Sequence, residues 1–333
     1  MATYYGTYGQ KVQYLASDPS DPQIGQVWYN STSAVLKVRQ EVATNAWATG
    51  GNLNTGRNTL GSAGTQTAAL GFGGTPNAST ATELYNGTSW TSNPTGLNTG
   101  GFGVIGIGTQ IAAVAAGRFT GPGALSGTTE NWNGSSWSPI TNLNTTRYDG
   151  AGSGTQTAGL AFGGATPPIT GATEEYNGTS WTNKSSMNTA RSGLGGASAG
   201  TATATLAFGG NAPSYSTATE SYDGTSWTTV PGSLNTARGA HIGGAGTQTA
   251  AIAFGGDTPS GSPTYTTATE LWNGTSWTTN PTGLATARYG IGSCGTQTAA
   301  LGFGGDDTTP GQALVNTEEW TGTVISTKTV TVS

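Results

Sequence analysis

Alternating small and large apolar residues recur along most of the chain. Ala68, Leu70 and Phe72, for example, alternate with smaller residues, and a diglycine follows them. A period of two is typical of a β-strand that packs one face against a neighbouring sheet. The 333 residues include 56 glycines, and no long stretch is rich in Leu, Glu, Lys and Ala. The pattern therefore predicts an all-β protein without helices that organise the fold.

A tight turn and a tryptophan follow each of these strands. After a short loop come Thr82–Tyr85 and then Asn86-Gly87, a pair that readily adopts the positive φ angles of a hairpin turn. Trp90 then begins the predicted returning strand. The tryptophans that follow the same turn in later repeats are Trp137, Trp181, Trp227 and Trp277.

One pattern returns six times along the chain. It reads N-T-x-R, then G-T-Q-T, F-G-G, a loop, and T-E-x-Y/W-N-G-T-S-W. The repeat length fits a four-stranded propeller blade and exceeds that of leucine-rich or ankyrin units. Six occurrences predict a six-bladed β-propeller rather than a seven-bladed one. The glutamates that mark the repeats, 44 to 50 residues apart, are Glu83, Glu130, Glu174, Glu220, Glu270 and Glu318.

The repeat resembles the Kelch repeat over about residues 47 to 325. The resemblance rests on the diglycine, the Glu-x-Tyr strand, the tryptophan a few residues later and the arginine at the start of the repeat. It implies a Kelch-like propeller. The five residues from Tyr85 to Trp90 make a shorter turn than the one after Y-D-P in typical Kelch blades, so the hairpin departs from the family pattern.

Arginine and glutamate recur once in almost every repeat. We interpret them as structural Arg–carboxylate pairs within blades rather than as ligand contacts, because the chain has few charges and guanidinium suits bidentate pairing. In the second repeat Gly101 replaces the arginine and Arg118 replaces the second glycine of the diglycine, which predicts a positional swap. The predicted structural residues are Arg57, Glu83, Trp90, Arg118, Glu130, Arg147, Glu174, Arg191, Glu220, Arg238, Glu270, Arg288 and Glu318.

The last repeat lacks a clean N-G-T-S-W ending, while Asn45-Ala46-Trp47 upstream resembles an isolated outer strand. We expect an N-terminal strand containing Trp47 to complete the last blade and cover edges that would otherwise promote aggregation. The alternative is that residues 325–332 form that strand and that Trp47 belongs to a separate hairpin with residues 27–38.

Residues 1–44 do not match the repeat and form a predicted first domain, ahead of a propeller domain at residues 45–333. Residues 25–30 and 35–38 predict a short β-hairpin. Their motif, G-x-V-W-Y-N-S-T followed by L-K-V-R, is similar to a segment common in tail-fibre and other virion proteins of bacteriophages. The resemblance implies attachment to other virion proteins. The alternative is a cap over one end of the propeller.

Charge and composition argue against several partners. A formal net charge of −5 with eleven lysines and arginines leaves no basic surface for nucleic acid or anionic membranes. Residues 1–11 lack a basic region followed by an apolar run, and no stretch approaches about 18 apolar residues, so we expect no Sec signal and no membrane insertion. Single Cys294 and His241 residues predict no internal disulfide and no histidine metal cluster. We expect no cofactor.

Catalysis is not expected either. A copper site of the galactose-oxidase type, known among Kelch-like folds, needs several imidazole and phenolate ligands. His241 is predicted to be packed or to line a channel, and Cys294 to be a small buried residue. Asp257, Asp306 and Asp307 follow diglycines and are the best carboxylates for glycoside hydrolysis or a calcium site. A solvated turn is the simpler interpretation of these aspartates.

The loops between the diglycine and Thr-Glu vary most between repeats, and variable loops on a constrained scaffold are where binding residues concentrate. The leading hypothesis is a virion surface protein, of tail-fibre or decoration type, that displays the propeller and adheres to host glycans. The alternatives are an intracellular Kelch-type adaptor that binds a protein and a free carbohydrate-binding lectin. The predicted contact residues are Phe119, Tyr215, Tyr265, Asp257, Asp306 and Asp307.

Overall fold

The computed structural model describes residues 12–121, 123–259, 265–307 and 312–330, and within them every regular element is a β-strand. These strands form six sheets, five with four strands and one with six. Contacts divide the chain into two units. We call Ala46–Trp320 the propeller, and we call the described residues of Met1–Asn45 and Thr321–Ser333 the terminal unit.

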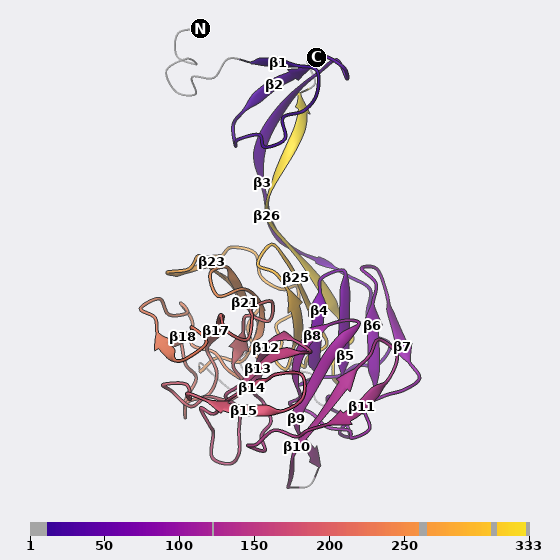
Figure 1. Cartoon of the computed structure of the whole chain (residues 1–333), viewed down its shortest axis with the longest axis vertical. Coiled ribbons are helices and arrows are strands. Elements are labelled where there is room, and N and C mark those ends of the chain that lie inside the picture. The colour runs from indigo at the N-terminus through magenta and orange to yellow at the C-terminus, as the bar shows by residue number, and fades with distance from the viewer. Residues whose placement is uncertain (1–11, 122, 260–264, 308–311, 331–333) are drawn as a thin grey trace. The chain divides into compact units, whose positions relative to one another are not determined.

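Five blades of the propeller are four-stranded sheets whose strand order follows the sequence (Figure 1). Blade 1 contains β4 (Gly61–Thr65), β5 (Ala68–Phe72), β6 (Thr82–Tyr85) and β7 (Trp90–Asn93). Blade 2 contains β8 (Ile105–Thr109), β9 (Ala112–Gly121), β10 (Ala124–Trp132) and β11 (Trp137–Ile140). Blade 3 contains β12 (Ala151–Thr155), β13 (Ala158–Phe162), β14 (Thr173–Tyr176) and β15 (Trp181–Lys184). Blade 4 contains β16 (Gly195–Gly196), β17 (Thr205–Phe208), β18 (Thr219–Tyr222) and β19 (Trp227–Thr229). Blade 5 contains β20 (Gly243–Gly246), β21 (Ala251–Phe254), β22 (Thr269–Trp272) and β23 (Trp277–Asn280).

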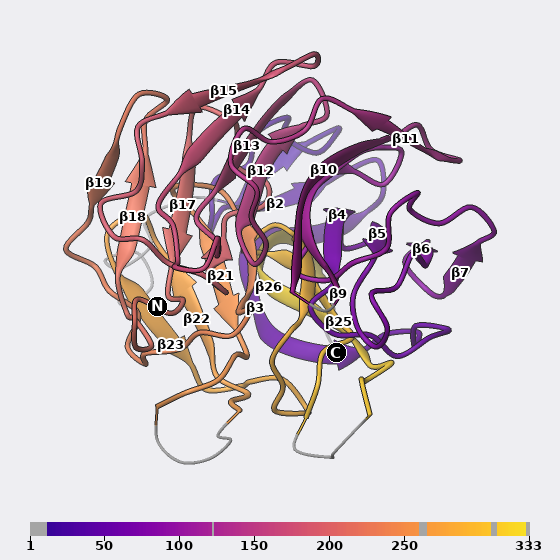
Figure 2. The ribbon, with the colours of Figure 1, turned by 90° about the horizontal axis from the view of Figure 1, so that it is seen from below.

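The first strands of the blades form a closed circle. Blade 6 begins with β24 (Gly292–Gly295) and β25 (Ala299–Phe303), and β24 contacts both β20 and β4. Each other first strand likewise contacts the first strands of the two neighbouring blades. Figure 2 shows the blades following one another around a centre. Six sheets closed into a ring make the six-bladed, all-β propeller that the repeat predicted.

An N-terminal strand completes blade 6. Its outer strands are β26 (Thr317–Val330) and β3 (Val35–Thr49), which is hydrogen-bonded to β26. Trp47 of β3 donates its indole N–H to Thr269 Oγ1 at 2.9 Å, and its ring centroid lies 4.7 Å from that of Phe254. Trp137 makes the equivalent bond to Thr82 Oγ1 in blade 1. The predicted closure by the strand that contains Trp47 is therefore confirmed.

The rival closure is wrong. Residues 325–330 extend β26 itself and do not form the outer strand, while residues 331 and 332 lie outside the described residues. A physical reason is that the outer position needs an indole to fill the slot against the neighbouring blade, and residues 325–332 contain no aromatic side chain. The hairpin with residues 27–38 is also present. The strand β3 has 15 residues, and it pairs with β2 on one side and with β26 on the other side of the same sheet.

In the terminal unit, β2 (Val27–Asn30) pairs with β3 and with β1 (Gln13–Leu15). These strands belong to the six-stranded sheet. Asp18 organises the terminal unit, since its carboxylate accepts hydrogen bonds from Trp28, Asn30 and Lys37. The contact with Lys37 is the largest cause that lowers the pKa of Asp18 to about 2. The predicted hairpin is confirmed.

The predicted boundary at residues 44 and 45 differs from the structural one in two respects. The N-terminal division falls after Asn45, one residue later, and the C-terminal residues from Thr321 onward belong to the terminal unit rather than to the propeller. This follows because β26 continues past Trp320 as a neighbour of β3.

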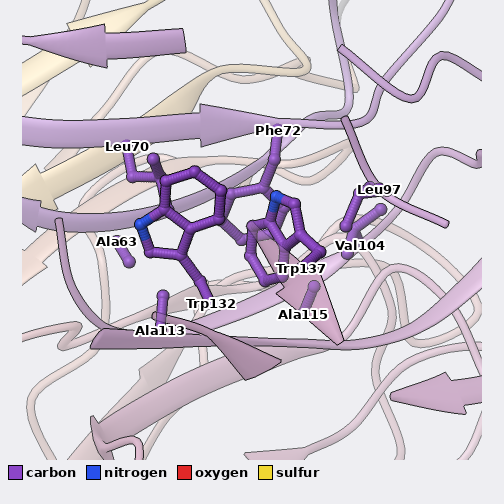
Figure 3. Packing of buried hydrophobic residues seen from close by; sticks show 9 residues of the cluster. All are labelled: Ala63, Leu70, Phe72, Leu97, Val104, Ala113, Ala115, Trp132 and Trp137. Carbon is purple, nitrogen blue, oxygen red and sulfur yellow. The ribbon is translucent and has the colours of Figure 1, made fainter. Parts of the chain in front are cut away.

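Neighbouring blades pack through aromatic and small side chains. The rings of Phe72 and Trp137, from blades 1 and 2, meet edge-on with centroids 4.8 Å apart. A Cβ atom on Gly61 would lie 2.3 Å from the ring of Phe72, so the innermost strand needs glycine there. Replacing one such buried aromatic by alanine typically costs about 3–5 kcal/mol. Figure 3 shows the cluster: Ala63, Leu70, Phe72, Leu97, Val104, Ala113, Ala115, Trp132 and Trp137.

The glutamine of G-T-Q-T hydrogen-bonds one blade to the preceding one. Gln66 Nε2 donates to the carbonyls of Ala300 at 3.1 Å and Trp320 at 2.6 Å, both in blade 6. The equivalent glutamines in blades 2, 3, 5 and 6 are Gln110, Gln156, Gln248 and Gln297. Blade 4 has Ala202 at this position and therefore lacks this bond to blade 3.

Candidate binding face

Each blade's arginine fixes the base of the loop that follows the diglycine. Arg57 Nη2 lies 2.9 Å from Glu83 Oε1, while its Nη1 donates to the carbonyls of Gly73 and Ala81, which begin and end the loop. The second oxygen of Glu83 accepts the backbone N–H of Asn54. The same pairing is present in every blade, as Arg118–Glu130, Arg147–Glu174, Arg191–Glu220, Arg238–Glu270 and Arg288–Glu318.

All six guanidinium groups are buried with no measurable exposure. Burial lowers the pKa of Arg147 to about 10, and the nearby Glu174 carboxylate opposes that effect, so the guanidinium group stays protonated at neutral pH. These arginines hold loops in place and offer no charge to a ligand, as the sequence predicted for a structural role.

Arg118 reaches Glu130 from the adjacent strand β9, whereas the other arginines precede the first strand of their blade. Its Nη1 lies 2.9 Å from Glu130 Oε1 and its side chain is fully buried. A Cβ atom on Gly101 would lie 2.8 Å from Cγ of Arg118, so the two positions share one space and only one of them can carry the long side chain. The structure thus agrees with the predicted swap.

The swap also reshapes the loop of blade 2. The second glycine of the other diglycines has positive φ, for example +102° at Gly74, whereas Arg118 is not among the residues with positive φ. Because arginine keeps the backbone extended, β9 and β10 run for ten and nine residues, against five and four in blade 1. The loop becomes a hairpin that carries Phe119.

A ring of backbone hydrogen bonds surrounds one mouth of the central channel. It involves the second residue after the arginine position in each blade. Gly103 N donates to Thr59 O, and Asp149 N donates to Gly103 O, at 2.8 and 2.9 Å. The ring continues through Gly193, His241 with Ala240, and Gly290 back to Thr59. This circle defines which loops share one face of the propeller.

Blade 5 has one extra residue in this ring, since Ala240 accepts the bond from Gly290 while His241 donates to Gly193. His241 Nε2 lies 2.9 Å from Asp149 Oδ1, so the pair connects blades 5 and 3 across blade 4. Burial disfavours the imidazolium ion, but Asp149 outweighs it and raises the pKa of His241. His241 lines the channel, one of the two roles predicted for it.

The channel itself is narrow. Its cavity has a volume of about 80 Å³ and is lined by glycines and apolar side chains from all six blades, with Ser62, Ser198, Ser293 and His241 as polar side chains. That space holds on the order of six water molecules. A ligand of saccharide size must therefore bind on the surrounding face and not inside the channel.

Side-chain variation is concentrated around that mouth. In each blade the residue after the arginine position forms a bridge with the residue after the diglycine position. We call these twelve residues, with the described residues of the loops that follow them, the binding face. The bridged pairs are Asn58–Thr75, Phe102–Phe119, Tyr148–Ala165, Ser192–Asn211, Gly239–Asp257 and Tyr289–Asp306.

One part of the binding face is a continuous series of tyrosines and aspartates. Tyr215 of blade 4 donates its hydroxyl to Asp257 of blade 5. Tyr265 of blade 5 forms a β-bridge with Asp257. Its ring is tilted against that of Tyr289 of blade 6, with centroids 4.6 Å apart. Asp306 of blade 6 accepts a hydrogen bond from Asn58 Nδ2 of blade 1 at 2.9 Å. We call Tyr215, Asp257, Tyr265, Tyr289, Asp306 and Asn58 the tyrosine–aspartate arc.

Two residues of the arc have raised pKa values, with burial as the largest cause. Burial, followed by the contact with Asp257, raises the pKa of Tyr215 to about 12. Burial, followed by the charge of Asp307, raises the pKa of Asp306. Next to the arc, Asn211, Pro213, Ser214, Tyr215 and Pro259 line a groove of about 420 Å³.

A second part of the binding face is apolar. Phe119 packs against Phe102 and against Tyr148 of blade 3, with ring centroids 5.1 and 5.3 Å away. We call Phe102, Phe119 and Tyr148 the phenylalanine cluster. All three are half-buried, so parts of their rings stay exposed.

The structure brings five predicted contact residues to the binding face, namely Phe119, Tyr215, Tyr265, Asp257 and Asp306, and Asp307 follows Asp306 in the same loop. Sequence reasoning missed Asn58, Phe102, Tyr148 and Tyr289 because it searched only the loops after the diglycine. The signal was variation directly after the arginine.

Several residues considered for chemistry lie elsewhere. Cys294 is buried, and burial raises the pKa of its thiol to about 12. Within residues 12–121, 123–259, 265–307 and 312–330, no group of three or more His, Cys, Asp or Glu side chains is placed to hold a metal ion. The same described part of the chain has no helix of the length and apolarity that crossing a membrane requires.

The fold and this face define the class of the protein as a six-bladed β-propeller with a variable loop face. Among solved structures, the chain matches the one titled "Structure of YjhT" with a TM-score of 0.69 and 12% sequence identity, over 83% of this chain and 99% of that one. At that identity the likeness shows the fold alone. No family model and no curated protein matches the chain, so the Kelch and tail-fibre resemblances stay predictions.

Proposed function

We propose that the chain is a non-enzymatic binding protein that contacts a glycan with the binding face of its propeller. One observation carries the proposal: the blade interiors repeat almost unchanged, while the side chains around one channel mouth differ in every blade. A scaffold needs the repetition, whereas a contact surface needs the variation. Tyrosine rings offer flat apolar surfaces with a polar edge, which suits stacking on sugars.

We place this activity at the surface of a virion, where the terminal unit attaches the propeller to other virion proteins. The support is the likeness of residues 25–38 to tail-fibre segments, together with the place of those residues in the terminal unit rather than in the propeller. Host glycans are then the natural ligands, because a displayed propeller meets the host envelope first.

Two measurements test this proposal. Peptide mass spectrometry and antibody-gold electron microscopy on purified particles should find the chain at stoichiometric abundance and at regular positions. A glycan array probed with the full chain should show binding to a defined set of saccharides. Presence only in soluble fractions would contradict the virion setting, and an empty array would contradict the glycan ligand.

The phenylalanine cluster favours a second candidate, a protein partner. Three half-buried aromatic rings pack against one another in this cluster, which resembles the aromatic centres of protein interfaces. An adaptor of this kind would lose its partner on Phe119→Ser while keeping any glycan binding, so the same variant separates the two candidates.

A further inference from the structure

We infer that the tyrosine–aspartate arc selects its ligand by charge, and that the ligand is a saccharide bearing protonated amino groups. This inference rests on the proposed glycan-binding function and narrows it to a chemical class. It follows from which charges the propeller leaves available on the binding face.

The propeller has no cation to offer an anionic ligand. Between residues 46 and 320 the sequence contains six arginines and Lys184 as its only arginines and lysines. The arginines are fully buried against glutamates, and Lys184 Nζ is paired with Glu175 Oε2 at 2.6 Å. His241, the only histidine, lies against Asp149. A carboxylated or sulfated sugar would meet carboxylates without a compensating charge.

The arc instead presents carboxylates that accept hydrogen bonds from neutral groups. Asp257 accepts from the Tyr215 hydroxyl and from the backbone N–H of Thr258, and Asp306 accepts from the Asn58 amide. An ammonium group would supply the missing opposite charge, and its hydrogen bonds to a carboxylate are stronger than those of a neutral hydroxyl.

The aromatic rings act in the same direction. The rings of Tyr265 and Tyr289 lie against each other beside the two aspartates, and the face of a tyrosine ring attracts cations within about 6 Å. Carboxylate and ring face therefore select the same ligand chemistry. The groove of about 420 Å³ beside Tyr215 provides room for a sugar unit next to the arc.

The test uses the full chain and three oligosaccharides of equal length: a glucosamine oligomer, its N-acetylated counterpart and an oligogalacturonate. Calorimetry is run at about pH 5.5, where the amines are protonated, and at low salt, which screens charges least. We expect the glucosamine oligomer to bind at least about tenfold more tightly than the N-acetylated one, with a preference that falls as salt rises. The oligogalacturonate should not bind.

Two isosteric variants carry the test to the residues. Asp257→Asn and Asp306→Asn remove one charge each with little change of shape, and each should reduce the preference for the amine severalfold. Asp223→Asn is the matched control, because Asp223 lies in a hairpin turn where the other repeats have Asn, for example Asn273. It changes net charge equally and should leave the preference unchanged.

The outcomes separate the inference from the function on which it rests. Equal binding of the three oligomers, or tightest binding of the galacturonate, would overturn charge selection and leave glycan binding intact. A failure of every saccharide, on the array as well as in calorimetry, would overturn both. An equal loss of preference in Asp223→Asn would assign the effect to net charge and reject the arc.

Discussion

The interior of the blades and the binding face follow opposite rules. Inside, the same arginine–glutamate pair recurs with contacts near 2.9 Å in blades 1, 2 and 3, and a tryptophan of one blade donates to a threonine of the blade before. On the face, the bridged pairs range from Phe102–Phe119 to Gly239–Asp257.

The difference teaches where each kind of substitution should act. Interior residues define the ring and the positions at which loops leave it, so their loss should destabilise the fold. Residues of the face form none of the buried arginine–glutamate pairs, so their loss should affect binding more than stability.

The largest effect should come from the swapped arginine. Arg118→Gly leaves Glu130 buried without its partner, and breaking a buried pair in this way costs about 3–5 kcal/mol. Adding Gly101→Arg restores the arrangement of the other blades and should recover most of the loss, because both positions face the same space. Denaturant unfolding of the two single variants and the double variant measures the coupling.

A matched control is Lys184→Met, which removes a partly exposed ion pair with Glu175 and should cost about 1 kcal/mol or less. If the double variant were no more stable than Arg118→Gly alone, the shared space would not explain the swap. Arg118 would then not be equivalent to the arginines of the other blades, although all six pair with a glutamate.

Ring closure should give the next effect. Trp47→Ala removes an indole packed on Phe254 and Trp320 and its bond to Thr269, at a cost of about 3 kcal/mol. Its counterpart inside a continuous blade, Trp137→Ala, should cost a similar amount. Thermal unfolding checks both, and a Trp47 variant that unfolds like the unaltered chain would contradict closure by β3.

The smallest effect concerns the pH dependence of the channel mouth. Because the folded state raises the pKa of His241, its pairing with Asp149 contributes stability that is fully present below the ordinary histidine pKa. That contribution is lost as pH rises through the raised value. Since the chain has one histidine, its titration by NMR is unambiguous.

His241→Gln should remove this pH dependence and cost roughly 1 kcal/mol or less at low pH. A measured pKa at or below the ordinary histidine value would contradict the pairing. Asp149→Asn is expected to lower the histidine pKa, because burial then acts without the opposing carboxylate, and to leave the backbone ring unchanged.

The repeat made the fold predictable from the sequence. Six copies of one motif specify six blades, and the isolated Trp47 predicted which strand closes the ring, because a lone tryptophan at the repeat's outer-strand position needs a partner. The arginine–glutamate pairs were also predictable, because an arginine that recurs in a charge-poor repeat needs a partner of opposite charge once it is buried.

The binding face was only partly predictable. Tyr215, Tyr265, Asp257 and Asp306 lie in loops that vary visibly between repeats, but their contacts cross from one blade to the next. Asn58 and Tyr289 meet those loops through blade geometry that one repeat does not reveal. The extension of β26 beyond Trp320 was hidden because the last repeat loses its turn motif there.

The most direct test of the account compares binding and stability in one pair of full-length variants. Tyr265→Ser with Tyr289→Ser alters the binding face, and Ile111→Ser alters an exposed residue in a turn outside the bridged pairs. We predict that the tyrosine variant loses binding to the saccharide found on the array while its thermal unfolding stays within a few degrees of the unaltered chain, and that Ile111→Ser keeps both. Full binding by the tyrosine variant, or loss of binding in Ile111→Ser alone, would contradict the assignment of function to this face.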